Sequence, residues 1–128
     1  MSRYNLEFGK ACEKEAVRYL QEKGYKVIEE NYKTRLGEID IIASDKSTTC
    51  FIEVKSRSSL DFGRPKEAIS KNKQHKISQS ALIYLKAHNL LDKSARFDVI
   101  EIIFDKATQG RAFSLIKDAF SLDSAYTY

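Results

Sequence analysis

Residues 36–43, LGEIDIIA, and residues 49–57, TCFIEVKSR, decide the fold, because both are apolar runs that carry charged residues at alternate positions. Side chains alternate between the two faces of a β-strand, so each run predicts a strand with an apolar face and a partly charged face. Residues 44–48 between them are turn-like. We therefore predict that the two strands form a hairpin.

A symmetric closure of that hairpin predicts which residues face one another. Asp40 would lie opposite Glu53, and Glu38 would lie opposite Lys55. The predicted faces of the first strand are Glu38, Asp40 and Ile42 on one side and Ile39, Ile41 and Ala43 on the other. Two carboxylates would thus stand about 5 Å apart on neighbouring strands.

Such a pair of like charges indicates a metal site. Facing carboxylates repel, and burial adds to the cost, whereas Mg²⁺ or Mn²⁺ takes carboxylate oxygens and keeps waters for a substrate phosphate. Lys55 follows Glu53 on the same face and is a candidate for holding an attacking water or neutralising a phosphoryl oxygen. The alternative is a solvent-exposed hairpin face, in which Glu38 and Lys55 form an ordinary surface ion pair.

The rest of the chain predicts an α/β fold. The expected elements are a helix at 6–23 closed by Gly24, a strand at 25–32, a loop at 58–65, a helix at 70–89 capped by Ser70, and strands at 96–104 and 113–116. A hairpin followed by a crossover helix predicts a mixed central sheet of about five strands flanked by two main helices. The length predicts one domain over residues 1–128.

Charge is distributed unevenly along the chain. The net charge is +4, but residues 55–76 contain seven basic and two acidic side chains. Candidates for contact with a phosphate backbone are Arg57, Arg64, Lys66, Lys71, Lys73 and Lys76. The three lysines at 71, 73 and 76 could equally form a solvated helical face.

Composition excludes several other classes. No apolar run is long enough to span a bilayer, and no secretion signal is recognisable at the N-terminus. Cys12 and Cys50 have no zinc-site spacing, which predicts buried reduced thiols in a cytoplasmic protein. We expect Asp98 to be structural.

The two strand runs also carry a family resemblance. Residues 37–43, GEIDIIA, and 51–57, FIEVKSR, resemble the YraN-like uncharacterised bacterial proteins, which are similar to archaeal Holliday-junction resolvases of the PD-(D/E)XK, or restriction-endonuclease-like, nuclease superfamily. Further matching positions are Gly9, Glu13 and Ala16, Asn31, Gly63 and Pro65, Lys73, and residues 96–99, RFDV. The family pattern usually has a second glycine where this chain has Cys12.

The resemblance implies site residues and a reaction. Asp40 and Glu53 would ligate the metal, together with the carbonyl of Val54. Lys55 would be the catalytic lysine, and Glu13 would complete the site from the first helix. Glu38 is a candidate for a supporting or second-metal role.

We therefore expect a Mg²⁺- or Mn²⁺-dependent DNA endonuclease of restriction-endonuclease-like architecture. The similarity to resolvases favours branched or junction DNA, and a homodimer would supply the two sites that opposed cuts require. The alternative is a nucleic-acid-binding module that keeps the nuclease fold without cleaving.

Overall fold

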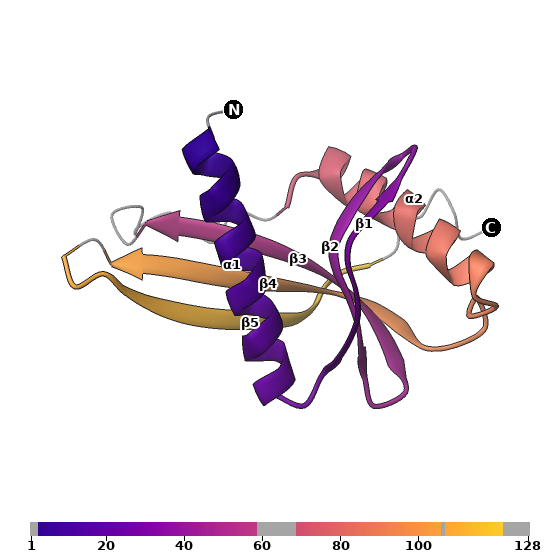
Figure 1. The fold of residues 1–128 in the computed structure, drawn as a ribbon. Coiled ribbons are helices and arrows are strands. Elements are labelled where there is room, and N and C mark those ends of the chain that lie inside the picture. Colours follow the sequence, from indigo (N-terminus) through magenta and orange to yellow (C-terminus); the bar gives the residue numbers. More distant parts are fainter. Residues whose placement is uncertain (1–2, 59–68, 106, 122–128) are drawn as a thin grey trace.

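The computed structural model describes residues 3–58, 69–105 and 107–121, and its elements follow the predicted order (Figure 1). The elements are α1 (Arg3–Glu22), β1 (Lys26–Thr34), β2 (Gly37–Asp45), β3 (Thr48–Ser58), α2 (Lys71–Ala87), β4 (Ala95–Asp105) and β5 (Gly110–Phe120). The main difference is β5, which has eleven residues instead of the predicted four. Exposed residues, including Arg111, Lys117 and Asp118, flank the half-buried stretch 113–116 on both sides, so the apolar pattern marked only the centre of the strand.

The five strands form one mixed sheet in the order β1-β2-β3-β4-β5. All neighbours are antiparallel except β3 and β4, which run parallel and are joined through α2. A parallel pair needs a crossover connection, and α2 lies in that connection. The predicted α/β class and mixed sheet are thereby confirmed, and the arrangement is consistent with a restriction-endonuclease-like fold.

The helices cover opposite faces of the sheet (Figure 1). On the α1 face, Cys12, Ala16 and Leu20 pack against alternate sheet residues such as Ile52 and Ile100. The α2-face core contains Ile42, Phe51, Ile77, Ala81, Tyr84, Phe97 and Val99. Strand alternation explains this division, since neighbouring residues of β3 and β4 point to opposite faces. Both cysteines are buried and free, as predicted.

The β2–β3 hairpin has the predicted register, but only along part of its length. Its pairing runs from Asp45 with Thr48 to Ile41 with Ile52 and then ends. Asp40 and Glu53 are therefore not partners in the ladder, which corrects the prediction. The predicted pairing of Glu38 with Lys55 is also wrong, because these residues pair instead with Lys33 of β1 and Glu101 of β4.

The strands separate because the end of the β1–β2 hairpin turns onto α2 (Figure 1). Thr34 Oγ1 lies 3.0 Å from Ser80 Oγ, within hydrogen-bonding distance. A side chain at Gly37 would place its Cβ 3.2 Å from Ser80 Oγ, so glycine permits this close approach. Ile39 consequently joins Ile42 in the α2-face core. The expected grouping of Ile39 with Ile41 was wrong.

The helix ends follow the sequence signals. Ser70 caps α2, because its side-chain oxygen accepts a hydrogen bond from the backbone N–H of Lys73. Gly24 follows α1 with φ +94°, a conformation that favours glycine. In the described parts of the chain, neither helix combines the length and apolar character needed to cross a bilayer.

Candidate active site

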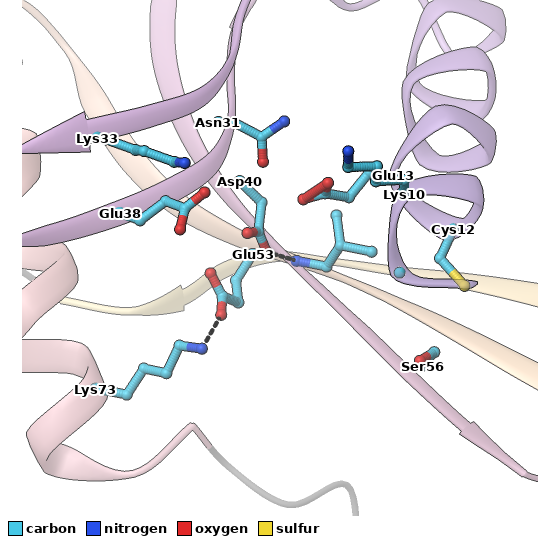
Figure 2. Close-up of a pocket in the computed structure, with 12 residues that line it drawn as sticks. Lys10, Cys12, Glu13, Asn31, Lys33, Glu38, Asp40, Glu53, Ser56 and Lys73 are labelled. Carbon is cyan, nitrogen blue, oxygen red and sulfur yellow. Dashed lines mark hydrogen bonds and ion pairs between the residues drawn. The ribbon is translucent and has the colours of Figure 1, made fainter. Parts of the chain in front are cut away.

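A cavity of about 670 Å³ lies between α1, the β1–β2 hairpin, β3 and the first turn of α2 (Figure 2). Its lining residues are Gly9, Lys10, Cys12, Glu13, Asn31, Lys33, Glu38, Asp40, Glu53, Val54, Ser56 and Lys73. Four carboxylates thus face three lysines. If all seven are ionised, the cavity carries a surplus of one negative charge.

Asp40 occupies the point at which β2 leaves β3. Its Oδ2 accepts a hydrogen bond of 2.8 Å from the backbone N–H of Val54. The carboxylate therefore satisfies a backbone donor that the separated strand no longer pairs, and it turns toward β3 (Figure 2). Asp40 and Glu53 are thus not paired in the sheet, because the strands separate at this point. Their side chains nevertheless line the same cavity.

Glu53 is the most buried of the four acids, with 6% of its surface exposed. Burial and the negative charge of Asp40 raise the pKa of Glu53 to about 7. The ammonium of Lys73 lies 2.6 Å from Glu53 Oε2 and opposes this shift, but it does not outweigh the other two effects. The positive charge of Lys73 therefore only partly balances the negative charge of ionised Glu53.

Glu13 reaches the same cavity from α1 (Figure 2). Burial raises the pKa of Glu13, and the charges of Asp40 and Glu38 add to the effect. When the Asn31 amide is oriented to donate, its nitrogen lies 3.1 Å from Glu13 Oε2 and 3.2 Å from Glu38 Oε1. Asn31 has φ +54°, uncommon for a non-glycine residue, and lies between residues paired with Ile39 and Ile41 of β2. The irregularity in β1 thus directs an amide toward two carboxylates.

Lys55 does not line the cavity. It lies on β3 in register with Glu101 of β4, whereas the lysine that contacts Glu53 is Lys73, from the first turn of α2. The structure therefore brings together Glu13, Asp40 and Glu53 but supplies a different cation from the predicted one. Val54, assigned by resemblance as a carbonyl ligand, does line the cavity.

The predicted phosphate-binding residues occupy several different environments. Arg57 is partly buried, and its Nε lies 3.3 Å from Glu101 Oε2, so an acidic partner already holds it. Lys71 and Lys76 are exposed on α2. Arg64 and Lys66 lie outside the described residues.

Sequence reasoning gave no site role to several residues of the cavity wall, among them Lys10, Lys33 and Asn31, although Asn31 was a matching position in the family resemblance. Spacing could have indicated them. Lys10 precedes Glu13 by three residues and so lies on the same helix face, and Lys33 follows Asn31 by two residues on one strand.

Among residues 3–58, 69–105 and 107–121, no three His, Cys, Asp or Glu side chains form a group that could hold a metal by themselves. Asp40 and Glu53 provide only two carboxylates. Their chemistry nevertheless fits Mg²⁺ or Mn²⁺, hard ions that are commonly held by one or two carboxylates and substrate phosphates. A dication would also offset the negative surplus around buried Glu53.

Comparison with known proteins extends the resemblance to nearly the whole chain. Residues 12–102 match the model of the family described as "Uncharacterised protein family UPF0102". A UPF0102 protein of Syntrophus aciditrophicus (strain SB) is 47% identical over 118 residues, covering 92% of this chain and 91% of that protein. A UPF0102 protein of Clostridium kluyveri is 43% identical over 122 residues, covering 95% of this chain and all of that protein. The matched span includes Glu13, Asp40, Glu53 and Lys73.

Proposed function

The chain belongs to the UPF0102 family, and we propose that it is a metal-dependent DNA endonuclease that hydrolyses backbone phosphodiesters at the cavity described above. One observation carries the proposal: Glu13 of α1, Asp40 of β2 and Glu53 of β3 converge in one cavity, where burial and neighbouring negative charges raise the pKa values of Glu13 and Glu53. A site with this imbalance is costly to keep unless binding or catalysis uses it.

The carboxylates of Asp40 and Glu53, with the carbonyl of Val54, would hold one Mg²⁺ or Mn²⁺. The bound ion would supply charge neutralisation at the phosphoryl group and a lowered pKa for an attacking water. The remaining steps, proton transfer and positioning of the substrate, would fall to side chains of the protein. Glu13 has a raised pKa, which brings it closer to the range of a proton acceptor near neutral pH, and Asn31 holds it in place.

The lysines of the cavity wall would orient the substrate. Lys10, Lys33 and Lys73 come from α1, β1 and α2 and so approach a bound phosphate from three directions. Lys55 remains the lysine that the family resemblance assigns to the attacking water, although in the structure it stands outside the cavity. Cleavage of branched DNA, a homodimer and a cytoplasmic location stay predictions.

The test is a panel of end-labelled linear, flapped and four-way DNAs incubated with Mg²⁺, Mn²⁺ or EDTA. Wild type is compared with Asp40→Asn and with Asp92→Asn, a matched substitution of an exposed aspartate that does not line the cavity. We expect metal-dependent cleavage by wild type and Asp92→Asn and none by Asp40→Asn. Identical products from wild type and Asp40→Asn would rule out this site. Salt-dependent DNA binding without hydrolysis would replace the proposal by the non-cleaving module.

A further inference from the structure

The ion pair between Lys73 and Glu53 joins two very different side chains. The Lys73 Nζ lies 2.6 Å from Glu53 Oε2 (Figure 2). The Glu53 side chain is 7% exposed, whereas the Lys73 side chain is 55% exposed. The carboxylate is thus fixed in the floor of the cavity, and the ammonium reaches it from the solvent side.

Lys73 offsets a cost that the fold itself creates. Glu53 is buried beside Asp40, so its negative charge lacks both hydration and a favourable neighbour on β2. Lys73 supplies the nearest positive charge among the described residues. One ammonium, however, balances only one of the two carboxylates, and a dication could balance both.

Release of Lys73 from Glu53 would not disturb the start of α2. The lysine lies in the first turn of α2, where the backbone N–H of Lys73 is already satisfied by the Ser70 side chain, so the helix end does not depend on the ion pair. Its stem is flexible and half-exposed, and a released ammonium would regain its hydration. Glu53, held in β3, has no comparable freedom.

We propose that Lys73 is a resident counter-ion of Glu53, which a divalent cation displaces from the carboxylate and thereby frees to contact the substrate phosphate. The inference rests on the proposed function, because it assigns the metal to Asp40 and Glu53. It adds that, until the metal arrives, the chain itself partly balances the charge of Glu53 through Lys73. Metal binding and exposure of a phosphate-binding lysine are then one coupled event.

Competition for Glu53 distinguishes this role from that of a permanent structural ion pair. If Lys73 competes with the metal, its replacement by methionine, which keeps a similar stem without the charge, must tighten metal binding. If Lys73 only stabilises the fold, the same replacement leaves metal affinity unchanged or weakens it. Lys71→Met is the matched control, because it removes an exposed positive charge from the same helical turn without touching the cavity.

The experiment is a calorimetric titration of wild type, Lys73→Met and Lys71→Met with Mn²⁺. We expect Lys73→Met to bind Mn²⁺ about tenfold more tightly than wild type, as an ion pair with a buried carboxylate of ordinary strength implies, and Lys71→Met to stay within about twofold. Equal affinities in the two variants would overturn the inference while leaving the metal site in place. Failure of all three proteins to bind Mn²⁺ would overturn the proposed function as well.

A second measurement needs no variant with altered stability. In wild type labelled with ¹³C-lysine, saturation with Mg²⁺ should move the Lys73 Cε resonance to the position of a solvent-exposed lysine. Asp40→Asn, with its ligand set incomplete, should show no such movement at the same Mg²⁺ concentration. A Lys73 resonance that stays in place while Mg²⁺ saturates the wild-type site would contradict displacement.

Discussion

Two acidic clusters that border the sheet, both within the described residues, differ greatly in how far positive and hydrogen-bonding groups balance their negative charges. The cavity cluster consists of Glu13, Glu38, Asp40 and Glu53. The second cluster, the Asp98 network, consists of Asp98 and Asp45 with Tyr25, Arg96 and Lys117. In both, the backbone N–H of a neighbouring strand donates to an aspartate, from Val54 to Asp40 and from Asp118 to Asp98. The aspartates therefore replace interrupted ladder bonds in both places.

The partners of these aspartates differ. Asp98 is fully buried and accepts hydrogen bonds from the Tyr25 hydroxyl and from Arg96 Nε. The hydrogen bond from Arg96 also lowers the pKa of Asp45. In the cavity, by contrast, the pKa values of Glu13 and Glu53 are raised. The network thus favours the anion of Asp45, whereas the cavity disfavours the anions of Glu13 and Glu53, which is the difference expected between a structural network and the cation site that we propose.

The largest expected effect is on DNA cleavage, which a substitution in the cavity cluster should abolish and one in the Asp98 network should not. Asp40→Asn keeps an oxygen that can accept the Val54 N–H but removes a charge that would hold the metal. We expect cleavage to fall by about 10³-fold, with no loss of stability because repulsion on Glu53 is relieved. Cleavage rates and thermal unfolding of the same preparations measure both. A variant that unfolds earlier than wild type would show that Asp40 is structural.

The matched substitution in the Asp98 network should give the reverse result. Asp98→Asn leaves Arg96 without its fully buried partner, so we expect a loss of about 3 kcal/mol in the free energy of unfolding. Metal affinity of the protein that remains folded should be unchanged. Urea unfolding followed by circular dichroism measures the loss. A change within about 0.5 kcal/mol would mean that the network contributes little to stability.

The pKa of Glu53 predicts a pH dependence. The pKa of Glu53 is about 7 in the folded, metal-free protein, above its ordinary value of 4.5. Protonated Glu53 therefore stabilises the folded state relative to the unfolded state, fully below about pH 4.5, and this stabilisation is lost as the pH rises through about 7. Metal binding must remove that proton. The Mn²⁺ dissociation constant should therefore increase by about tenfold per pH unit below pH 7.

Glu53→Gln is the control for this pH dependence, since it has no proton to lose. Any residual Mn²⁺ binding by that variant should be much weaker and lack the slope between pH 5 and about 7. Calorimetric titrations at several pH values test this. If the Mn²⁺ dissociation constant of wild type begins to rise only below pH 5, Glu53 is already charged at neutral pH in the metal-free protein.

The smallest effect concerns the backbone at Asn31. Asn31→Gly tolerates φ +54°, whereas Asn31→Ala is strained there, so the alanine variant should be about 1 kcal/mol less stable than the glycine variant. Both lose the amide that faces Glu13 and Glu38, and both should lose activity by a similar factor. Equal stabilities would mean that β1 relaxes to a regular strand at this position.

Much of the fold and part of the site could be predicted because they depend on local pattern. Alternation identified β2 and β3, and turn residues set the register near Asp45 and Thr48. The prediction that Asp98 is structural agrees with its saturated hydrogen bonding. Lys73 was predicted as a phosphate contact, but nothing in its helical spacing indicated that it faces Glu53. That contact depends on where the crossover places the first turn of α2.

The sequence by itself determined β1 to β4 and the centre of β5, the Ser70 cap of α2, the glycine that follows α1 and the identity of the clustered acids, because each follows from the chemistry of neighbouring residues. The family relationship was also evident in the strand motifs and was confirmed by the UPF0102 match. Only the tertiary structure decided that β2 leaves β3 at Asp40, that the Asn31 amide lies between Glu13 and Glu38, and that Lys73 takes the place expected for Lys55. Those outcomes depend on packing between elements distant in sequence, above all on the hairpin that bends onto α2.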